Sequence, residues 1–189
     1  NVGILFLYLI AFYACLAMMG ISPLLSLLGA VAFGLGSYNI IIIEAGHITK
    51  AYAISMMAPI LVGMLLTLRK KYLLGGILFS FALGLQIAFN HIQITYYTAI
   101  AGVVLGITYA VYAIKDKWIK QFLTSVGVLL LGCAMALTIN SRHLFVNQQY
   151  AEYTMRGGSE ISVTPEDLYK DGEPKSIAGK TSGLDIDYA

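Results

Sequence analysis

Six runs of mostly apolar residues constrain this chain more than any other feature of its sequence. They cover residues 2–19, 23–43, 51–68, 72–89, 94–114 and 122–139. A helix needs roughly 20 mostly apolar residues to cross a bilayer, and each run is close to that length. With 58% hydrophobic and only 12% charged residues, the chain is too apolar for a soluble domain of its size. We predict an all-α fold, a polytopic transmembrane helical bundle of about six spans over residues 1–139.

The composition changes abruptly at Asn140, where charged residues, glycines and prolines replace the apolar runs. Residues 1–139 contain seven Lys and Arg against two acidic residues, a net charge of +5, whereas residues 140–189 contain five against eight, a net charge of −3. We predict that 140–189 is a separate polar segment, with one helix over 142–155 and a second that starts at Thr164. The basic residues are scattered at helix ends, so they form no coherent face for a nucleic acid.

Three residues inside the apolar runs predict local irregularities. Pro59 predicts a kink, because proline cannot donate a backbone hydrogen bond. Gly34 and Gly36 predict either close helix packing or a bend before the polar stretch that follows.

Cys15 and Cys133 also lie in apolar runs, where a thiol behaves as a small hydrophobic side chain, so they predict no disulfide framework.

Basic residues in two short loops predict how the bundle is oriented. Residues 69–71 are Arg-Lys-Lys, and residues 115–120 contain three lysines. Short loops rich in Lys and Arg are kept in the cytoplasm, so we predict that both loops are cytoplasmic. Alternation of the spans then places residues 44–50, residues 90–93 and the tail from Asn140 on the extracytoplasmic side.

The first candidate site combines a carboxylate, an imidazole and an ammonium in residues 44–50. Glu44 and His47 are three residues apart, so on a helix they would share a face, a spacing that suits a metal ion or a proton relay. The alternative is that Glu44, His47 and Lys50 form the solvated connection between two spans. Both interpretations stay open, and so does a divalent cation as cofactor, with no metal ligand assigned.

Two further polar clusters are candidates for binding a sugar or a phosphate. Asn90, His91 and Gln93 follow the fourth apolar run, with Gln86 one helical turn earlier; they suit hydrogen bonds to sugar hydroxyls, or else an amide that caps a helix. Arg156 precedes two glycines and offers a planar guanidinium beside flexible backbone, which suits a diphosphate or a carboxylate. A solvated turn is the competing interpretation of Arg156.

The order and spacing of several short motifs resemble the YfhO-like family of bacterial membrane proteins. The motifs are GSY at 36–38, AGHITK at 45–50, Pro59, LQI at 85–87, NHIQITYY at 90–97, YTMRGGSE at 153–160 and GLDIDYA at 183–189. The resemblance runs from about Ser37 to the end of the chain. The chain opens without a methionine or a basic leader and stops in a polar stretch, so we expect it to be an internal piece of a longer protein.

The resemblance implies a protein similar to the C-type glycosyltransferases of the bacterial cytoplasmic membrane. Such proteins take a sugar from a polyprenyl-phosphate carrier on the outer membrane face, and the acceptor would be a cell-envelope glycan or polymer. In that fold class the catalytic acid usually lies in the first outer loop, which we expect upstream of Asn1, so no catalytic residue is assigned. The resemblance implies that Glu44, His47, Lys50, Asn90, His91, Gln93 and Arg156 bind the substrate.

Two other classes of function remain as alternatives. A transporter or flippase for a lipid-linked sugar would place polar residues near the membrane midplane, often on broken helices, and Gly34 and Gly36 fit such a break. The spans contain almost no ionisable residues, which argues against ion coupling. The second alternative is a non-catalytic membrane subunit whose polar tail recruits a partner.

Overall fold

The structure is a computed structural model, and it describes residues 2–152, 169–170 and 173–174. Its helices are α1 Val2–Met18, α2 Pro23–Gly34, α3 Ser37–Glu44, α4 Ile48–Ser55, α5 Met57–Leu68, α6 Tyr72–Ala88, α7 Ile92–Lys115, α8 Ile119–Ile139 and α9 Ser141–Glu152. Two short antiparallel strands, β1 Tyr169–Lys170 and β2 Glu173–Pro174, are also described. The chain divides into two compact units, Asn1–Phe145 and Val146–Ala189.

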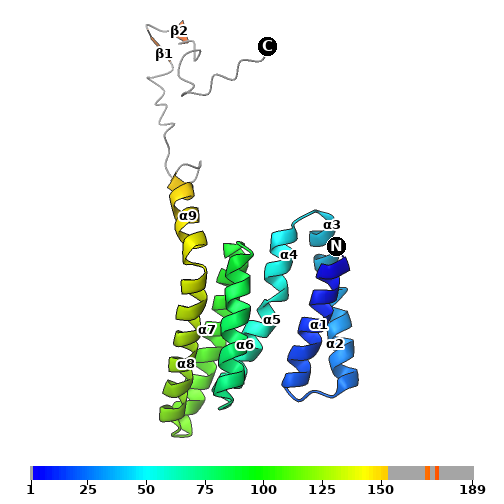
Figure 1. Cartoon of the computed structure of the whole chain (residues 1–189), viewed down its shortest axis with the longest axis vertical. Helices are drawn as coiled ribbons and strands as arrows, with labels where there is room; N and C mark the ends of the chain where they lie inside the picture. The colour runs from blue at the N-terminus through cyan, green and yellow to red at the C-terminus, as the bar shows by residue number, and fades with distance from the viewer. Residues whose placement is uncertain (1, 153–168, 171–172, 175–189) are drawn as a thin grey trace. The chain divides into compact units, whose positions relative to one another are not determined.

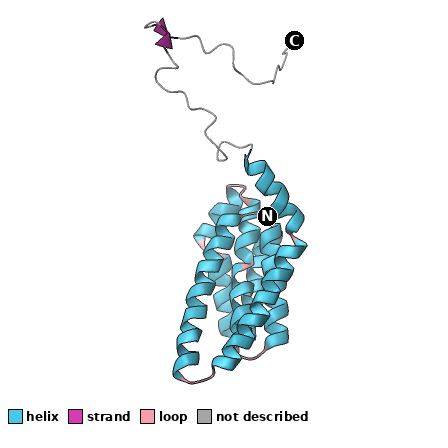
Figure 2. Cartoon of the chain, turned by 90° about the vertical axis from the view of Figure 1, so that its left-hand side faces the viewer, coloured by secondary structure: helices cyan, strands magenta, loops and turns pink. Residues whose placement is uncertain are grey.

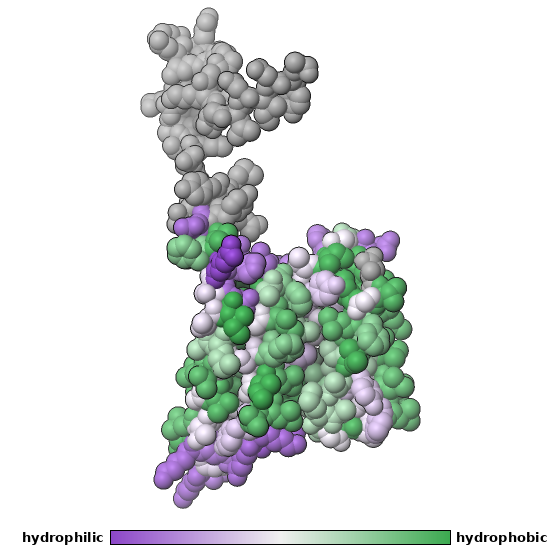
Figure 3. All heavy atoms as spheres, viewed as in Figure 1, coloured by the Kyte–Doolittle hydropathy of each residue, from purple (hydrophilic) through white to green (hydrophobic). Residues whose placement is uncertain are grey.

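The first unit is all-helical, as predicted, and its helices lie side by side (Figures 1 and 2). Three stretches are long and apolar enough to cross a membrane: Ile48–Leu68, which joins α4 and α5, then α7 and α8. The pair α2 and α3 passes the same test together and is bent by 45°. The shorter helices α1 and α6 have 17 residues each. Apolar side chains cover the visible face of the bundle between two more hydrophilic ends (Figure 3), which supports a membrane protein.

Helices α5 and α6 approach each other through glycines. A Cβ added to Gly63 on α5 would lie 2.6 Å from the backbone nitrogen of Phe79, and a Cβ added to Gly75 on α6 would collide with Thr67. Lipid tails are as apolar as leucine, so helices in a membrane associate by close packing and hydrogen bonds rather than by the hydrophobic effect. The two glycines let the α5 and α6 backbones meet.

Side-chain hydrogen bonds to backbone carbonyls attach α8 to the α5–α6 pair. Ser125 Oγ on α8 donates to the carbonyl of Thr67 at 3.1 Å, and Ser80 Oγ on α6 donates to the carbonyl of Gly132 at 3.2 Å. Asn140 Nδ2, at the end of α8, donates to the carbonyl of Gly84 at 3.0 Å. The three bonds link α8 to α5 or α6 near the start, in the middle and at the end of α8.

The predicted irregularities are found near Pro59 and Gly36. Helix α4 ends at Ser55 and α5 begins at Met57, two residues before Pro59, which has no N–H to donate to the Ser55 carbonyl. The bend between α2 and α3 falls at Leu35 and Gly36, where the Asn39 side chain donates to the carbonyl of Phe33 at 2.7 Å. Asn39 thereby satisfies a carbonyl in the last turn of α2.

The chain after Asn140 begins with one more helix. Helix α9 covers Ser141–Glu152, where the sequence predicted 142–155, and residues 153–155 lie outside the described part of the chain. Arg156 and the helix predicted to start at Thr164 also lie outside the described residues.

Replacing Gly75 with alanine is expected to destabilise the bundle by about 1–3 kcal/mol, because the new methyl group collides with Thr67. Gly127 is the matched control, since a Cβ added there on α8 meets nothing within 4 Å. Gly127→Ala should be neutral or stabilising by up to about 1 kcal/mol, from helix propensity alone. Reversible unfolding in mixed micelles, followed by circular dichroism, measures both changes. Equal stabilities of the two variants would contradict the close α5–α6 contact.

Candidate functional site

Two of the three predicted polar clusters lie in turns whose neighbouring helices, α4 and α6, are in contact. The α3–α4 turn contains Glu44 and His47, and the α6–α7 turn contains Asn90 and His91. A ring stack links α4 to the residue that follows α6: the Tyr52 and Phe89 centroids are 5.0 Å apart. Both rings pack against one hydrophobic cluster, whose buried members come from α1, α3, α4 and the start of α7.

The α3–α4 turn is closed by backbone hydrogen bonds around Gly46. Gly46 has φ +76°, its N–H donates to the carbonyl of Ile43, and the His47 N–H donates to the carbonyl of Ile42. This pair of bonds is the Schellman motif, which ends a helix at a left-handed residue. Helix α3 ends at Glu44 and His47 precedes α4, so the helical face that Glu44 and His47 were expected to share is not formed.

The charged side chains of this turn lie at the surface of the bundle. Glu44 and His47 are exposed and make no ion pair or side-chain hydrogen bond with any described residue. Lys50 is half-buried in the first turn of α4, with its Nζ 5.5 Å from the ring centroid of Tyr38 on α3. That distance is within the range of a cation–π contact, which holds the ammonium at this end of the bundle.

The α6–α7 turn contains a backbone cap and an incompletely bonded histidine. Asn90 has φ +56° directly after α6, so its backbone occupies the left-handed position that ends a helix. A cap made by its side-chain amide stays a prediction. His91 precedes α7, and its Nδ1 is buried without a hydrogen-bond partner among the described residues. Gln93 is exposed, and its Nε2 donates to the hydroxyl of Tyr97 at 2.8 Å.

Gln86 does not belong to a surface cluster with these residues. Its side chain is fully buried, and Nε2 donates to the carbonyl of Ala53 at 2.9 Å and to Thr98 Oγ1 at 3.1 Å. Gln86 therefore ties α6 to α4 and α7, one helical turn before the α6–α7 turn. Its Oε1 has no hydrogen-bond partner within the described part of the chain.

Sequence reasoning missed the aromatic residues that assemble this end of the bundle. Tyr38 and Tyr52 were not singled out as functional positions, although Tyr38 lies in one of the motifs of the resemblance. A tyrosine at the fifth position of α4 could have been found as a partner for Phe89 only if α4 had been known to contact the end of α6.

The described part of the site offers cationic and hydrogen-bond donor groups. Lys50 supplies an ammonium, and His47 and His91 supply imidazoles. Among the described residues, no group of three His, Cys, Asp or Glu side chains could hold a metal ion. The third predicted cluster, around Arg156, lies outside those residues.

Comparison with known proteins returns no match to a family model, to a curated protein or to a solved structure.

Asn90→Gly and Asn90→Val separate the backbone role of this residue from the role of its amide. Glycine adopts φ +56° without strain, so Asn90→Gly should keep the stability of the bundle within about 0.5 kcal/mol. A β-branched valine is strained there, and Asn90→Val should cost about 1–3 kcal/mol. Unfolding in mixed micelles measures both, and a valine variant as stable as the glycine variant would contradict the cap.

Proposed function

We propose that the helices of the first unit make six membrane crossings and that both polar turns face the extracytoplasmic side. The bent pair α2–α3 serves as one crossing, and the 17-residue helices α1 and α6 as two more. At 1.5 Å per residue, α6 separates Lys71 from the Asn90 turn by about 25 Å. Positive charges in the loops of residues 69–71 and 115–120 support a cytoplasmic position for that opposite end.

The function that this end of the bundle supports best is sugar transfer from a polyprenyl-phosphate carrier to a cell-envelope acceptor. The observation that carries the proposal is the stack of Tyr52, in the helix after the first polar turn, on Phe89, the residue before Asn90. The residues on either side of that contact include a half-buried lysine, Lys50, and two histidines, His47 and His91. The visible face of the bundle is rich in apolar side chains (Figure 3). A lipid-linked sugar phosphate combines an anion, hydroxyl groups and a long hydrocarbon chain, which match these three kinds of surface.

Sugar transfer from such a carrier requires the enzyme to stabilise a phosphate leaving group. When the bond from the sugar to the phosphate oxygen breaks, negative charge develops on the phosphate, and positioned cations or N–H donors lower the barrier. Lys50 is suited to this role because Tyr38 holds its ammonium near the surface. His91 is suited to donate a hydrogen bond, while Asn90 and Gln93 can bind sugar hydroxyls. Glu44 is the one acid in the two turns and is not assigned as the base.

Lys50→Ala and His91→Ala in the full-length protein should each lower sugar transfer on the order of 100-fold, the usual effect of removing one donor to a developing charge. Lys120→Ala is the matched control, because Lys120 is a lysine in the first turn of α8, at the opposite end of the bundle. Transfer of a labelled sugar from a polyprenyl-phosphate donor in proteoliposomes is the measurement. Unchanged transfer by both site variants, with normal folding, would contradict the site assignment.

The bend of 45° between α2 and α3 favours one alternative, a transporter or flippase for the lipid-linked sugar. Broken helices often form transport sites near the membrane midplane. Under this alternative, proteoliposomes should show counterflow of a labelled lipid-linked sugar and no transfer product. Formation of the transfer product by the full-length protein would exclude it.

A further inference from the structure

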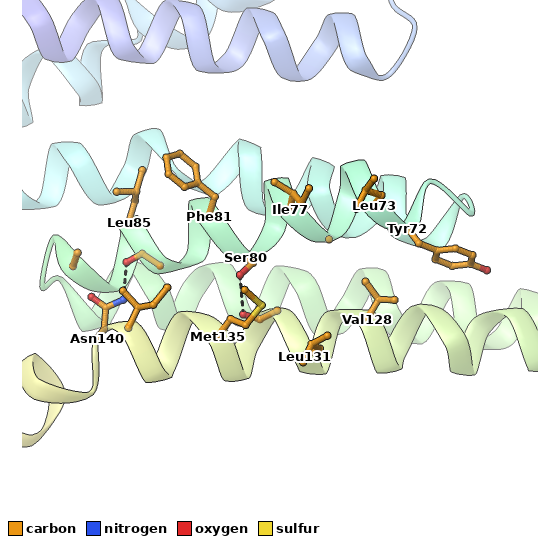
Figure 4. A pocket seen from close by; sticks show the side chains of 15 residues that line it. Tyr72, Leu73, Ile77, Ser80, Phe81, Leu85, Val128, Leu131, Met135 and Asn140 are labelled. Carbon is orange, nitrogen blue, oxygen red and sulfur yellow. Dashed lines mark hydrogen bonds between the residues drawn. The ribbon is translucent and has the colours of Figure 1, made fainter.

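A long groove runs between α6 and α8 on the surface of the first unit (Figure 4). Its volume is about 610 Å³, and apolar side chains line almost all of it. Small residues form much of its floor, because Gly76, Ser80 and Gly84 recur at every fourth position of α6 and Gly132 faces them from α8. Exposed side chains such as Ile77 and Leu131 flank it as ridges.

The groove has polar side chains at its two ends. Tyr72 lines one end, at the start of α6, and Asn140 lines the other, at the end of α8. Between them the one polar side chain of the lining is Ser80, whose hydroxyl already donates to the carbonyl of Gly132. The sequence of polar end, apolar middle and polar end follows the profile of a lipid bilayer, with the groove parallel to the helices.

Asn140 lines the groove and has one hydrogen-bond acceptor, Oδ1, that its own donated hydrogen bonds do not use. The side chain is 3% exposed, and its Nδ2 donates to the carbonyls of Gly84 at 3.0 Å and Ala136 at 2.8 Å. These two acceptors fix the orientation of the amide, so Oδ1 is the atom left over. No described residue donates a hydrogen bond to Oδ1, and the residue lines the groove. A ligand in the groove that placed a hydroxyl at this end would satisfy it.

Two basic side chains lie next to Asn140 in the sequence. Arg142 and His143 come two and three residues after Asn140, both exposed, in the first turn of α9. A guanidinium suits a phosphate, whereas the Asn140 oxygen suits a hydroxyl and repels a phosphate oxygen. The end of the groove therefore complements a head group that has both an anion and a free hydroxyl.

We propose that the α6–α8 groove binds a phospholipid whose acyl chain lies along the groove and whose anionic head group has free hydroxyls, as in phosphatidylglycerol. A hydroxyl donates to Asn140 Oδ1, and the phosphate lies within reach of Arg142. A second transmembrane helix fits the apolar middle of the groove equally well, but it accounts for neither the acceptor at the boundary nor the neighbouring cation. This site does not depend on the sugar-transfer proposal.

Lipids that differ in one group test the proposal on the unaltered protein. Phosphatidylglycerol, phosphatidylethanol and phosphatidylcholine with identical acyl chains are titrated into the purified full chain, and native mass spectrometry counts the lipids bound. Phosphatidylethanol has the same charge as phosphatidylglycerol and no free hydroxyl. Phosphatidylglycerol should bind about fivefold more tightly than phosphatidylethanol, the effect of one hydrogen bond. Equal binding of these two lipids would overturn the role of Asn140.

Substitutions inside and outside the groove test where the lipid binds. Ile77→Trp fills the groove from a ridge residue that is 61% exposed, and Val104→Trp adds the same side chain on α7 at a residue that is 60% exposed and does not line the groove. Ile77→Trp should abolish the preference for phosphatidylglycerol, and Val104→Trp should retain it. Arg142→Gln should lower the preference for both anionic lipids over phosphatidylcholine about fivefold.

Three outcomes would overturn the proposal. The first is a preference for phosphatidylglycerol that survives Ile77→Trp, which would place the lipid elsewhere. The second is displacement of phosphatidylglycerol by polyprenyl phosphate at equimolar concentration, which would assign the groove to the carrier. The third is a dimer that Ile77→Trp dissociates, which would assign the groove to a second copy of the chain.

Discussion

The close contact of α6 with α5 on one side and with α8 on the other is the interaction on which the rest of this structure depends. Lipid tails leave no hydrophobic driving force between helices in a membrane, so the helices are held by backbone approach and by hydrogen bonds. Gly63 and Gly75 provide the approach between α5 and α6, and Ser80 and Asn140 provide bonds to and from α8. Larger side chains at the two glycines would separate α5 from α6.

The position of α6 also determines where the polar groups meet. Gln86 bonds to the α4 carbonyl of Ala53 and to Thr98 of α7, and Phe89 stacks on Tyr52 one turn further on. The α3–α4 and α6–α7 turns are thereby held together, although about 40 residues separate them in the chain. The same helix forms one wall of the apolar groove with α8. One helix thus links the candidate sugar site and the proposed lipid site.

The sequence predicted the features that depend on local chemistry. The apolar runs indicated the helices and Pro59 indicated the interruption between α4 and α5, because each follows from the properties of a few neighbouring residues. The features that depend on contacts between helices were not predictable. Gln86 was grouped with surface residues, yet it is fully buried, because nothing in its neighbours reveals which face of α6 meets α4. Similarly, Gly46 adopts a left-handed conformation and α3 ends at Glu44. Glu44 and His47 therefore do not share a helical face, although their spacing in the sequence predicted that they would.

The central claim is that the α3–α4 and α6–α7 turns share one side of the membrane and the basic turns lie on the other. Single cysteines at His47→Cys, Gln93→Cys, Arg69→Cys and Lys120→Cys, in a background with Cys15 and Cys133 replaced by alanine, test it directly. A membrane-impermeant maleimide added to intact cells should label the cysteines at 47 and 93, and those at 69 and 120 only after permeabilisation. Labelling of 47 and 93 from opposite sides, or of all four from the same side, would contradict the account.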